Sequence, residues 1–232
     1  LFPLSLYNTA YFVVLSVPGQ IIIALGLALL LNTGIRGRSV YRTIFYLPMI
    51  VPAAASSLVF VWLLHPSLGV VKHLLDLLGL PSPLWFQSEV WSKPGIILLN
   101  LWHVGQNMVI FLAGLQDIPG HLYEAAEIDG ANWLQRLSSV TLPMLSPVIL
   151  FNLVMGLIGS FQYFTQAYVM TNGGPQDSTT FYALHLFNRA FFDFRMGYAS
   201  AMAWILFVIA LACTFVVLRS SARWVYYAGE AR

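Results

Sequence analysis

Neutral polar side chains recur at helical spacing inside two long apolar runs of this sequence. Asn100, His103 and Asn107 follow one another at steps of three and four residues, which puts them on one face of a helix. The second run contributes Gln162, Tyr163 and Gln166. These groups donate and accept hydrogen bonds without a fixed charge. They could line a path for a neutral, hydroxyl-rich molecule or hydrogen-bond between helices, and the sequence leaves both open.

The sequence offers little for covalent, metal or nucleotide chemistry. Its five histidines are scattered, and no pair has the i,i+4 spacing with an acid that is typical of a metal site. The glycine-rich stretch 171–179 lacks the Lys-Ser/Thr of a phosphate-binding loop, and no G-x-S-x-G turn occurs. The single cysteine, Cys213, lies in an apolar run. We therefore expect no catalytic residue, no cofactor and no metal ligand in this chain.

The composition is that of a chain that lies in a lipid bilayer. Only 9% of the 232 residues are charged, against roughly 25% in a soluble domain, and 59% are hydrophobic. A soluble chain of this length could not cover its surface with so few charges. The net charge of +2, without a cluster of lysines or arginines, excludes nucleic acid as a partner. We expect an all-α, multi-pass membrane protein.

Five apolar windows are long enough to cross a bilayer as helices, which takes about 20 residues each. They cover residues 9–31, 44–64, 94–115, 147–170 and 198–218, within a single transmembrane domain over residues 1–232. Pro18 should kink the first helix, and Pro48 and Pro52 should bend the second. In the fourth, Gly156, Gly159 and Ser160 favour close packing between helices.

The basic residues set the expected orientation, because loops rich in lysine and arginine stay in the cytoplasm. The loop after the first window holds Arg36, Arg38 and Arg42 without an acid. If this loop is cytoplasmic, the alternation of spans puts Arg136 and the C-terminal tail, with Arg219, Arg223 and Arg232, in the cytoplasm as well. The basic residues that remain outside are Lys72, Lys93, Arg189 and Arg195. Leu1 is then outside, so we expect a further span upstream of it.

Three segments between the windows should lie at the outer side. Residues 70–78 and 183–194 carry apolar side chains at helical spacing, which favours helices at the lipid surface over contact with an external partner. The glycine-rich stretch 171–179 is either a flexible turn or a contact for an external protein.

The segment 119–146 differs from its apolar neighbours, because it is acidic and helical and lies between the third and fourth windows. Pro119-Gly120 starts a helix that Gly130 ends, and Asn132 can cap a second short helix. Glu124 and Asp129 can accept hydrogen bonds from a partner's basic side chains, while Ala125 and Ala126 allow close approach. Leu142 and Pro143 begin the return to the membrane. Such a helix pair could transmit a partner's movement to two spans.

This segment resembles the EAA motif of permease subunits in binding-protein-dependent ABC importers. The matching residues are Glu124-Ala125-Ala126, Gly130 and, after nine residues, Val140-Thr141-Leu142-Pro143, where the family usually has isoleucine at Val140. Four other stretches are similar to the sugar-uptake branch, of the maltose and glycerol-phosphate type: "RTIFYLPMIVP" (42–52), "FLAGLQDIP" (111–119), "GSFQYFTQAYVMTNGGP" (159–175) and "MGYASAMA" (196–203). The resemblance covers essentially the whole chain.

The resemblance implies a helical bundle of the type I ABC importer permease kind in a bacterial plasma (inner) membrane. Five of the six spans of this branch would be visible here, with the upstream one missing. The partners would be two cytoplasmic ATPase subunits, a second permease subunit and an external solute-binding protein. The loop 119–146 would dock on an ATPase through Glu124, Ala125, Ala126, Asp129, Gly130, Leu142 and Pro143, and the cargo would be a sugar or related polyol.

Other interpretations remain open at this point. The same type of permease could carry a phosphorylated polyol, a polyamine, an amino acid or an oligopeptide. A channel or carrier that works without ATP is less favoured, because no acidic or basic side chain falls at the centre of a window. A membrane-embedded enzyme is the least favoured interpretation, because the sequence contains no recognisable set of catalytic residues.

Overall fold

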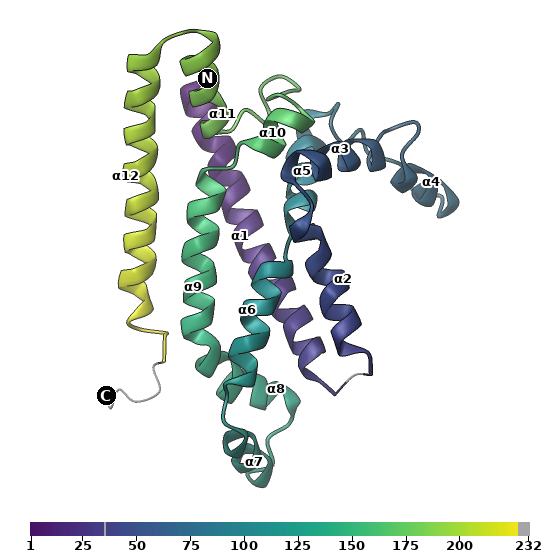
Figure 1. Ribbon diagram of the computed structural model, residues 1–232, viewed down its shortest axis with the longest axis vertical. Coiled ribbons are helices and arrows are strands. Elements are labelled where there is room, and N and C mark those ends of the chain that lie inside the picture. The colour runs from purple at the N-terminus through teal and green to yellow at the C-terminus, as the bar shows by residue number, and fades with distance from the viewer. Residues whose placement is uncertain (35, 227–232) are drawn as a thin grey trace.

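The computed structural model of the chain describes residues 1–34 and 36–226. Arg232, which the sequence assigned to the cytoplasmic tail, lies outside the described residues. Throughout the described ranges the regular structure is helical, with no strand. Figure 1 shows an elongated bundle with α10 and α11 near one end, here called the upper end, and α7 and α8 at the opposite, lower end.

Helix α1 (Phe2–Asn32) runs through the middle of the bundle. Its 31 residues correspond to about 46 Å at 1.5 Å per residue, which is more than a bilayer core requires. The helix continues through Pro18, which lies inside it. It packs against α5, α6, α9 and α11, so it is the element that most of the others share.

The second window forms two helices instead of one. Helices α2 (Arg38–Ile50) and α3 (Ala53–Leu63) meet at an angle of 100°. Between them Val51 is extended, with ψ 128°, and precedes Pro52. Proline disfavours the helical conformation in the residue before it and lacks an N–H of its own, so the predicted bend falls there. Helix α4 (Val70–Leu77) follows at the upper end, within the segment predicted to be amphipathic.

The third window is also divided, into α5 (Glu89–Trp102) and α6 (Gly105–Gln116), which are bent by 45° at His103 and Val104. The Ser88 hydroxyl accepts from the Val90 amide and caps α5. Gly105 lets α6 approach α2 closely: a Cβ at this position would lie 2.5 Å from the Phe45 carbonyl oxygen. The bend therefore lies where two helices meet backbone to backbone.

The segment 119–146 forms two helices at the lower end, joined directly to a long helix. Helix α7 (Gly120–Ile128) is capped by Asp129, and Gly130 follows with φ +75°. Helix α8 (Trp133–Arg136), the π-helical turn η1 (Leu137–Thr141) and α9 (Leu142–Phe161) then continue one another over 29 residues. The predicted glycine break and the predicted cap at Asn132 are both confirmed, the cap as a full capping box with Gln135.

The fourth window is divided near its upper end. Helix α9 stops at Phe161, and α10 (Thr165–Met170) begins after the non-helical residues 162–164. The polypeptide then forms a loop, α11 (Tyr182–Phe187), the π-helical turn η2 (Asn188–Phe192) and α12 (Met196–Ser221). Helix α12 lies along one side of the bundle, against α9, α11 and η2.

The loop 171–180 is firmly braced. Asn8 donates through Nδ2 to the carbonyls of Asp177 (2.9 Å) and Thr180 (3.2 Å), and Ser92 bonds to Ser178 (2.8 Å between hydroxyl oxygens). Ser178, Thr179 and Thr180 are buried. The alternative of a flexible turn is therefore wrong for the second half of this loop, which ties α1 to α5.

Within the described residues, three helices are long and apolar enough to cross a membrane, or up to five if each bent pair counts as one span. The three are α1, the helix 133–161 and α12; the bent pairs are α2–α3 and α5–α6. The predicted all-helical class is confirmed. The predicted number and boundaries of the membrane crossings stay a prediction.

Candidate functional site

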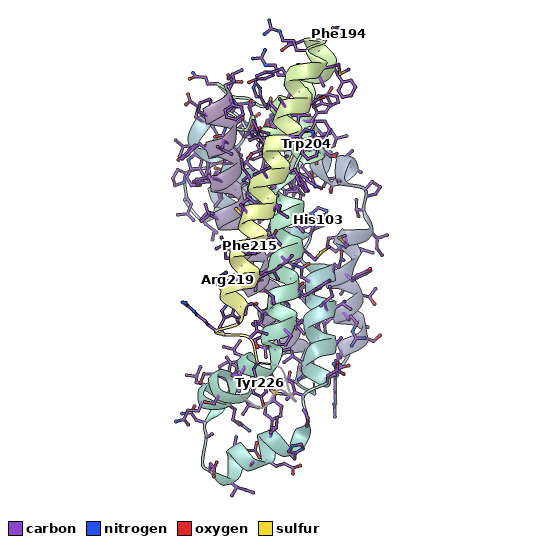
Figure 2. All side chains as sticks on the ribbon, turned by 90° about the vertical axis from the view of Figure 1, so that its left-hand side faces the viewer. His103, Phe194, Trp204, Phe215, Arg219 and Tyr226 are labelled. Carbon is purple, nitrogen blue, oxygen red and sulfur yellow. The ribbon has the colours of Figure 1, made fainter. Side chains whose placement is uncertain are left out.

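A cavity of about 570 Å³ lies between α1, α2–α3, α5–α6 and α9–α10. It brings together five of the six polar residues predicted to line a path, namely Asn100, His103, Asn107, Tyr163 and Gln166. Its volume is within the ~300–1,000 Å³ typical of small-molecule sites. Figure 2 shows His103 about midway between the two ends of the bundle. The cavity is therefore a polar chamber inside an otherwise apolar bundle.

Two polar atoms of the chamber's lining are buried without a hydrogen-bond partner among the described residues: Nε2 of His103 and the hydroxyl of Tyr163. The other ring nitrogen of His103, Nδ1, donates to the Leu99 carbonyl (2.9 Å), which leaves Nε2 of the neutral ring as an acceptor. The Tyr163 hydroxyl can donate. Each such buried, unsatisfied group costs about 1–3 kcal/mol. Both atoms lie beneath the surface of the chamber, so a solute hydroxyl can reach them only when the wall moves.

Asn100 both hydrogen-bonds between helices and lines the chamber. Its Nδ2 donates to the Ser16 hydroxyl, and its backbone carbonyl accepts from Nε2 of Gln20 (2.9 Å). Both partners are on α1, so these bonds hold α5 against the central helix. Asn100 also lines the chamber, where its side chain adds to the polar wall.

Several polar lining residues were not among the predicted path residues. Gln20 comes from α1 and Asn152 from α9, and Ser160 and Gln106 complete the polar wall. Gln20 and Asn152 are single amides in apolar runs, which is a signal that the sequence contains. That they face the same space as Asn100 follows only from the packing of α1, α5 and α9.

Gln162 lies outside this chamber, although its neighbour Tyr163 is part of the lining. Instead, Gln162 lies with Phe161 and Leu206 in a separate groove between α9, α11 and α12. Helix α9 ends at Phe161 and residues 162–164 are not helical, so the i,i+4 spacing does not place Gln162 on the same face as Gln166. The structure does not bring Gln162 together with the other five predicted residues.

Some small residues of α9 pack against a neighbouring helix, and others line the chamber. A Cβ at Gly156 would meet Val17 of α1 at 3.2 Å, as close packing predicts. A Cβ at Gly159 would meet nothing within 4 Å, so the packing prediction is wrong there. Gly159 instead leaves room at the edge of the chamber, whereas Ser160 is buried, as packing predicts, and also lines the chamber.

The chamber is electrically neutral. Among the described residues that line it there is no aspartate, glutamate, lysine or arginine. Its polar groups are amides, an imidazole and two hydroxyls, and its apolar groups include Met49, Phe151 and Met155. Such a wall can exchange hydrogen bonds with an uncharged polar molecule but has no ion to pair with a charged one.

The second predicted site, in the segment 119–146, forms a braced knob at the lower end of the bundle. Arg136 of α8 forms an ion pair with Glu127 of α7. The Tyr123 hydroxyl lies 3.1 Å from the Thr141 hydroxyl, which ties α7 to η1. The Gly130 amide donates to the Glu127 carbonyl (3.0 Å), closing the turn after α7. The two short helices are therefore held as one unit.

The predicted contact residues are distributed over this knob and its base. Glu124, Ala125, Asp129 and Gly130 are exposed and Ala126 is half-buried, while Leu142 and Pro143 are half-buried in the first turn of α9. Sequence reasoning missed three apolar side chains beside them. Ile128, Trp133 and Leu134 are 87%, 60% and 65% exposed. Isolated apolar residues in an acidic loop were the signal that could have identified them.

Comparison with known proteins assigns the chain to one family. The family model described as "binding-protein-dependent transport system inner membrane component" matches residues 20–232. Bacillus subtilis YesP, named as a probable ABC transporter permease protein, is 43% identical over 96% of this chain and 73% of its own length. The trehalose/maltose transport system permease MalF of Thermococcus litoralis is 35% identical over 93% of this chain and 73% of its own length.

The fold has solved counterparts as well. A bacterial alginate ABC transporter, crystallised with a periplasmic protein that holds an alginate pentasaccharide, contains a chain with a TM-score of 0.87 and 27% identity. The likeness covers 96% of this chain and 78% of that one. The predicted resemblance to the permeases of sugar-uptake ABC importers is thereby confirmed. The chain belongs to the family of binding-protein-dependent transport system inner membrane components, the multi-pass permease subunits of ABC importers.

Proposed function

We propose that this permease forms the path of a sugar or a related polyol across the membrane, and that the chamber is the part of the path that holds the solute. The observation that carries this proposal is the uncharged polar wall of the chamber, where the amides of Asn100, Asn107 and Gln166 lie together. An amide both donates and accepts hydrogen bonds, and a solute hydroxyl can satisfy both kinds of group. The names of relatives such as MalF support a carbohydrate cargo.

The neutral wall favours an uncharged cargo over the other classes of solute. A polyamine, a zwitterionic amino acid or a phosphorylated polyol would leave its charges unpaired in the chamber, which is costly away from water. A sugar presents many hydroxyls and apolar C–H faces. Amides such as Asn107 and Gln166 can bond the hydroxyls, and the apolar side chains of the wall can pack on the C–H faces.

The knob at the lower end is, in this proposal, the point where cytoplasmic ATPase subunits act. Its exposed Ile128, Trp133 and Leu134 would enter an apolar groove on an ATPase, and the carboxylates of Glu124 and Asp129 would bond basic side chains around it. Because α8, η1 and α9 are one continuous helix, movement of the knob reaches the chamber wall at Phe151 and Gly159 directly.

The rest of the assembly follows from the same proposal. Two ATPase subunits, a second permease subunit and an external solute-binding protein complete the importer, and ATP hydrolysis belongs to the ATPases. The lower end and the C-terminal tail are cytoplasmic, which agrees with Arg36, Arg38 and Arg136 lying at that end. The crystallised alginate transporter with its periplasmic protein supports the external partner.

The decisive experiment is to purify the tagged chain with its partners, reconstitute the complex in liposomes and measure solute-stimulated ATP hydrolysis. We expect two ATPase subunits in the complex and stimulation by neutral sugars such as maltose or trehalose. Stimulation by amino acids or polyamines alone would contradict the proposed cargo. Solute flux that persists after the ATPases are removed would contradict the importer mechanism itself.

A further inference from the structure

The chamber lies between two separate apolar cores of the bundle. The upper core joins α3, α5, α10 and α11 to the first part of α1, and its buried members include Phe12 and Leu184. The lower core joins α6 and the base of α9 to the second half of α1, and its buried members include Ala24 and Met108. Among the described residues, no side chain belongs to both cores. The helices around each core, which occupy the two halves of the bundle in Figure 1, are called here the upper body and the lower body.

Three connections between these bodies are broken helices. The α2–α3 connection turns by 100° at Val51 and Pro52, and the α5–α6 connection bends by 45° after Trp102. Helix α9 ends at Phe161, and the non-helical residues 162–164 lead to α10. A continuous α-helix is kept straight by hydrogen bonds between successive turns, and a break interrupts them. Each connection can therefore change its angle at its break.

All three breaks lie at the chamber. Its lining includes residues from each of them, namely Val51, Pro52, His103 and Tyr163. Helix α1 passes this level unbroken and contributes Gln20 to the same lining. Two residues earlier, Pro18 lacks the N–H that would bond to the Val14 carbonyl, so α1 is also weakened here. No side chain fills the chamber, and close packing therefore does not resist a change of angle at this level.

The two halves of the α2–α3 connection are fastened to different bodies. Helix α2 packs on α6, where the backbones meet at Gly105, and Phe45 of α2 packs against the lower core. Helix α3 packs on α10 instead. The knob also belongs to the lower body, because Leu122 and Tyr123 of α7 and Val140 of η1 pack against the lower core. Any movement of the knob is therefore a movement of the lower body.

The upper body is held to α1 by hydrogen bonds near the start of that helix. Asn8 donates to two carbonyls of the loop 171–180, and the Tyr182 amide donates to the Thr9 hydroxyl at 2.8 Å. The Lys93 ammonium of α5 donates to Oδ1 of Asn8 at 2.9 Å. These bonds fix α5, α11 and the loop to the part of α1 above Pro18. They leave the lower body free to turn.

We propose that the chamber is a hinge within this permease. The lower body, with the knob, rotates against the upper body at the level of the three breaks, and α1 near Pro18 is the unbroken pivot. The chamber wall comes from both bodies, with Gln166 on the upper and Asn107 on the lower one. Rotation therefore changes the width of the chamber and the spacing of its amides. The hinge follows from the packing of this chain, and only its drive by ATP rests on the proposed function of the knob.

The test measures distances between pairs of spin labels by double electron–electron resonance, in the full chain with Cys213→Ser, purified into lipid nanodiscs. Ser39 of α2 and Gln116 of α6 carry labels on the lower body, and Val59 of α3 and Glu89 of α5 on the upper body; all four are exposed. The two lower positions lie 12 residues from their breaks (51 − 39 and 116 − 104), about 18 Å along the helix. A rotation of about 15° moves them by about 5 Å.

We therefore expect the distance distributions of the cross-body pairs, Ser39 with Glu89 and Val59 with Gln116, to be about 5 Å broader than those of the two within-body pairs. Four equally narrow distributions would overturn the proposal. Pro52→Ala allows Val51 to become helical and should narrow the distribution of the Ser39–Glu89 pair. Pro48→Ala, the matched control inside α2, should leave that distribution as broad as before. Equal distributions in the two variants would contradict a hinge at this break.

The complete importer shows whether ATP drives the hinge. Trapping the ATPase subunits with ATP and vanadate should shift the cross-body distances by about 5 Å and leave the within-body distances unchanged. ATP hydrolysis without that shift would overturn the hinge as the route from the knob to the chamber. Absence of ATP hydrolysis would instead refute the proposed function of the knob, and the distributions in the purified chain would still decide whether the hinge exists.

Discussion

Replacing Tyr163 by phenylalanine removes a single oxygen atom and tests the reasoning about the chamber directly. The side chain is 8% exposed, its ring packs 4.3 Å from that of Phe12, and its hydroxyl has no partner among the described residues. An unsatisfied buried hydroxyl costs about 1–3 kcal/mol. Tyr163→Phe should therefore raise the free energy of unfolding by about that amount.

The same substitution should impair transport. If the hydroxyl bonds the solute, its loss removes a hydrogen bond of about 0.5–1.5 kcal/mol, or a factor of about 2 to 12. The assay is uptake of radiolabelled maltose into liposomes that contain the complete importer, with unfolding of the purified chain followed in parallel by far-ultraviolet circular dichroism. A variant that is more stable and yet slower in transport is the combined signature we expect.

Tyr182 provides the matched control. It is also buried, but its hydroxyl donates to the Met202 carbonyl at 3.0 Å. Tyr182→Phe should therefore lower the free energy of unfolding by about 1 kcal/mol, the opposite sign. If Tyr163→Phe destabilised the chain in the same way, the Tyr163 hydroxyl would have a structural partner and the argument for the chamber would fail. If it stabilised the chain without slowing uptake, Tyr163 would not touch the solute.

Three further predictions concern other parts of the chain. Gly105→Ala should destabilise the bundle by about 1–3 kcal/mol, because its Cβ would lie 2.5 Å from a backbone oxygen. Gly159→Ala, inside α9, meets nothing within 4 Å and should raise the free energy of unfolding by about 0.4–1 kcal/mol. Gly130→Pro should uncouple ATP hydrolysis from uptake or block ATPase assembly, since proline cannot adopt φ +75°; normal coupled transport would refute the role of the knob. Burial, with help from the charge of Arg189, lowers the pKa of His185, so the folded state binds fewer protons than the unfolded one. Stability should then be complete above pH 6.5 and fall as the pH drops below it, and His185→Phe should flatten this dependence in unfolding curves measured from pH 5 to 8.

Local features of the lower knob could be predicted from the sequence and agree with the structure. The break at Gly130 and the cap at Asn132 depend on backbone angles and hydrogen bonds within a few residues, which neighbouring side chains determine. The ion pair between Glu127 and Arg136 was not predicted. It joins two short helices across the turn, and its formation depends on the angle between them.

The chamber could be predicted only in part. Asn100, His103 and Asn107 share a face because a helix repeats every 3.6 residues, and the structure keeps them together despite the bend at His103. Gln162 shows where that rule stops. The helix ends one residue before it, so periodicity no longer relates it to Gln166.

By itself, the sequence determined that this protein is a helical membrane protein with a polar face in its interior and an acidic helix pair between two apolar segments. Those properties depend on residues that are close together in the sequence, because composition, periodicity and helix capping all act within a few turns of the chain. Only the tertiary structure decided which amides share a space, which hydroxyls have no partner, and that an apolar groove lies between α9 and α12. Those properties depend on how helices far apart in the sequence pack on α1, and packing at that range is determined by the shapes of all the side chains together.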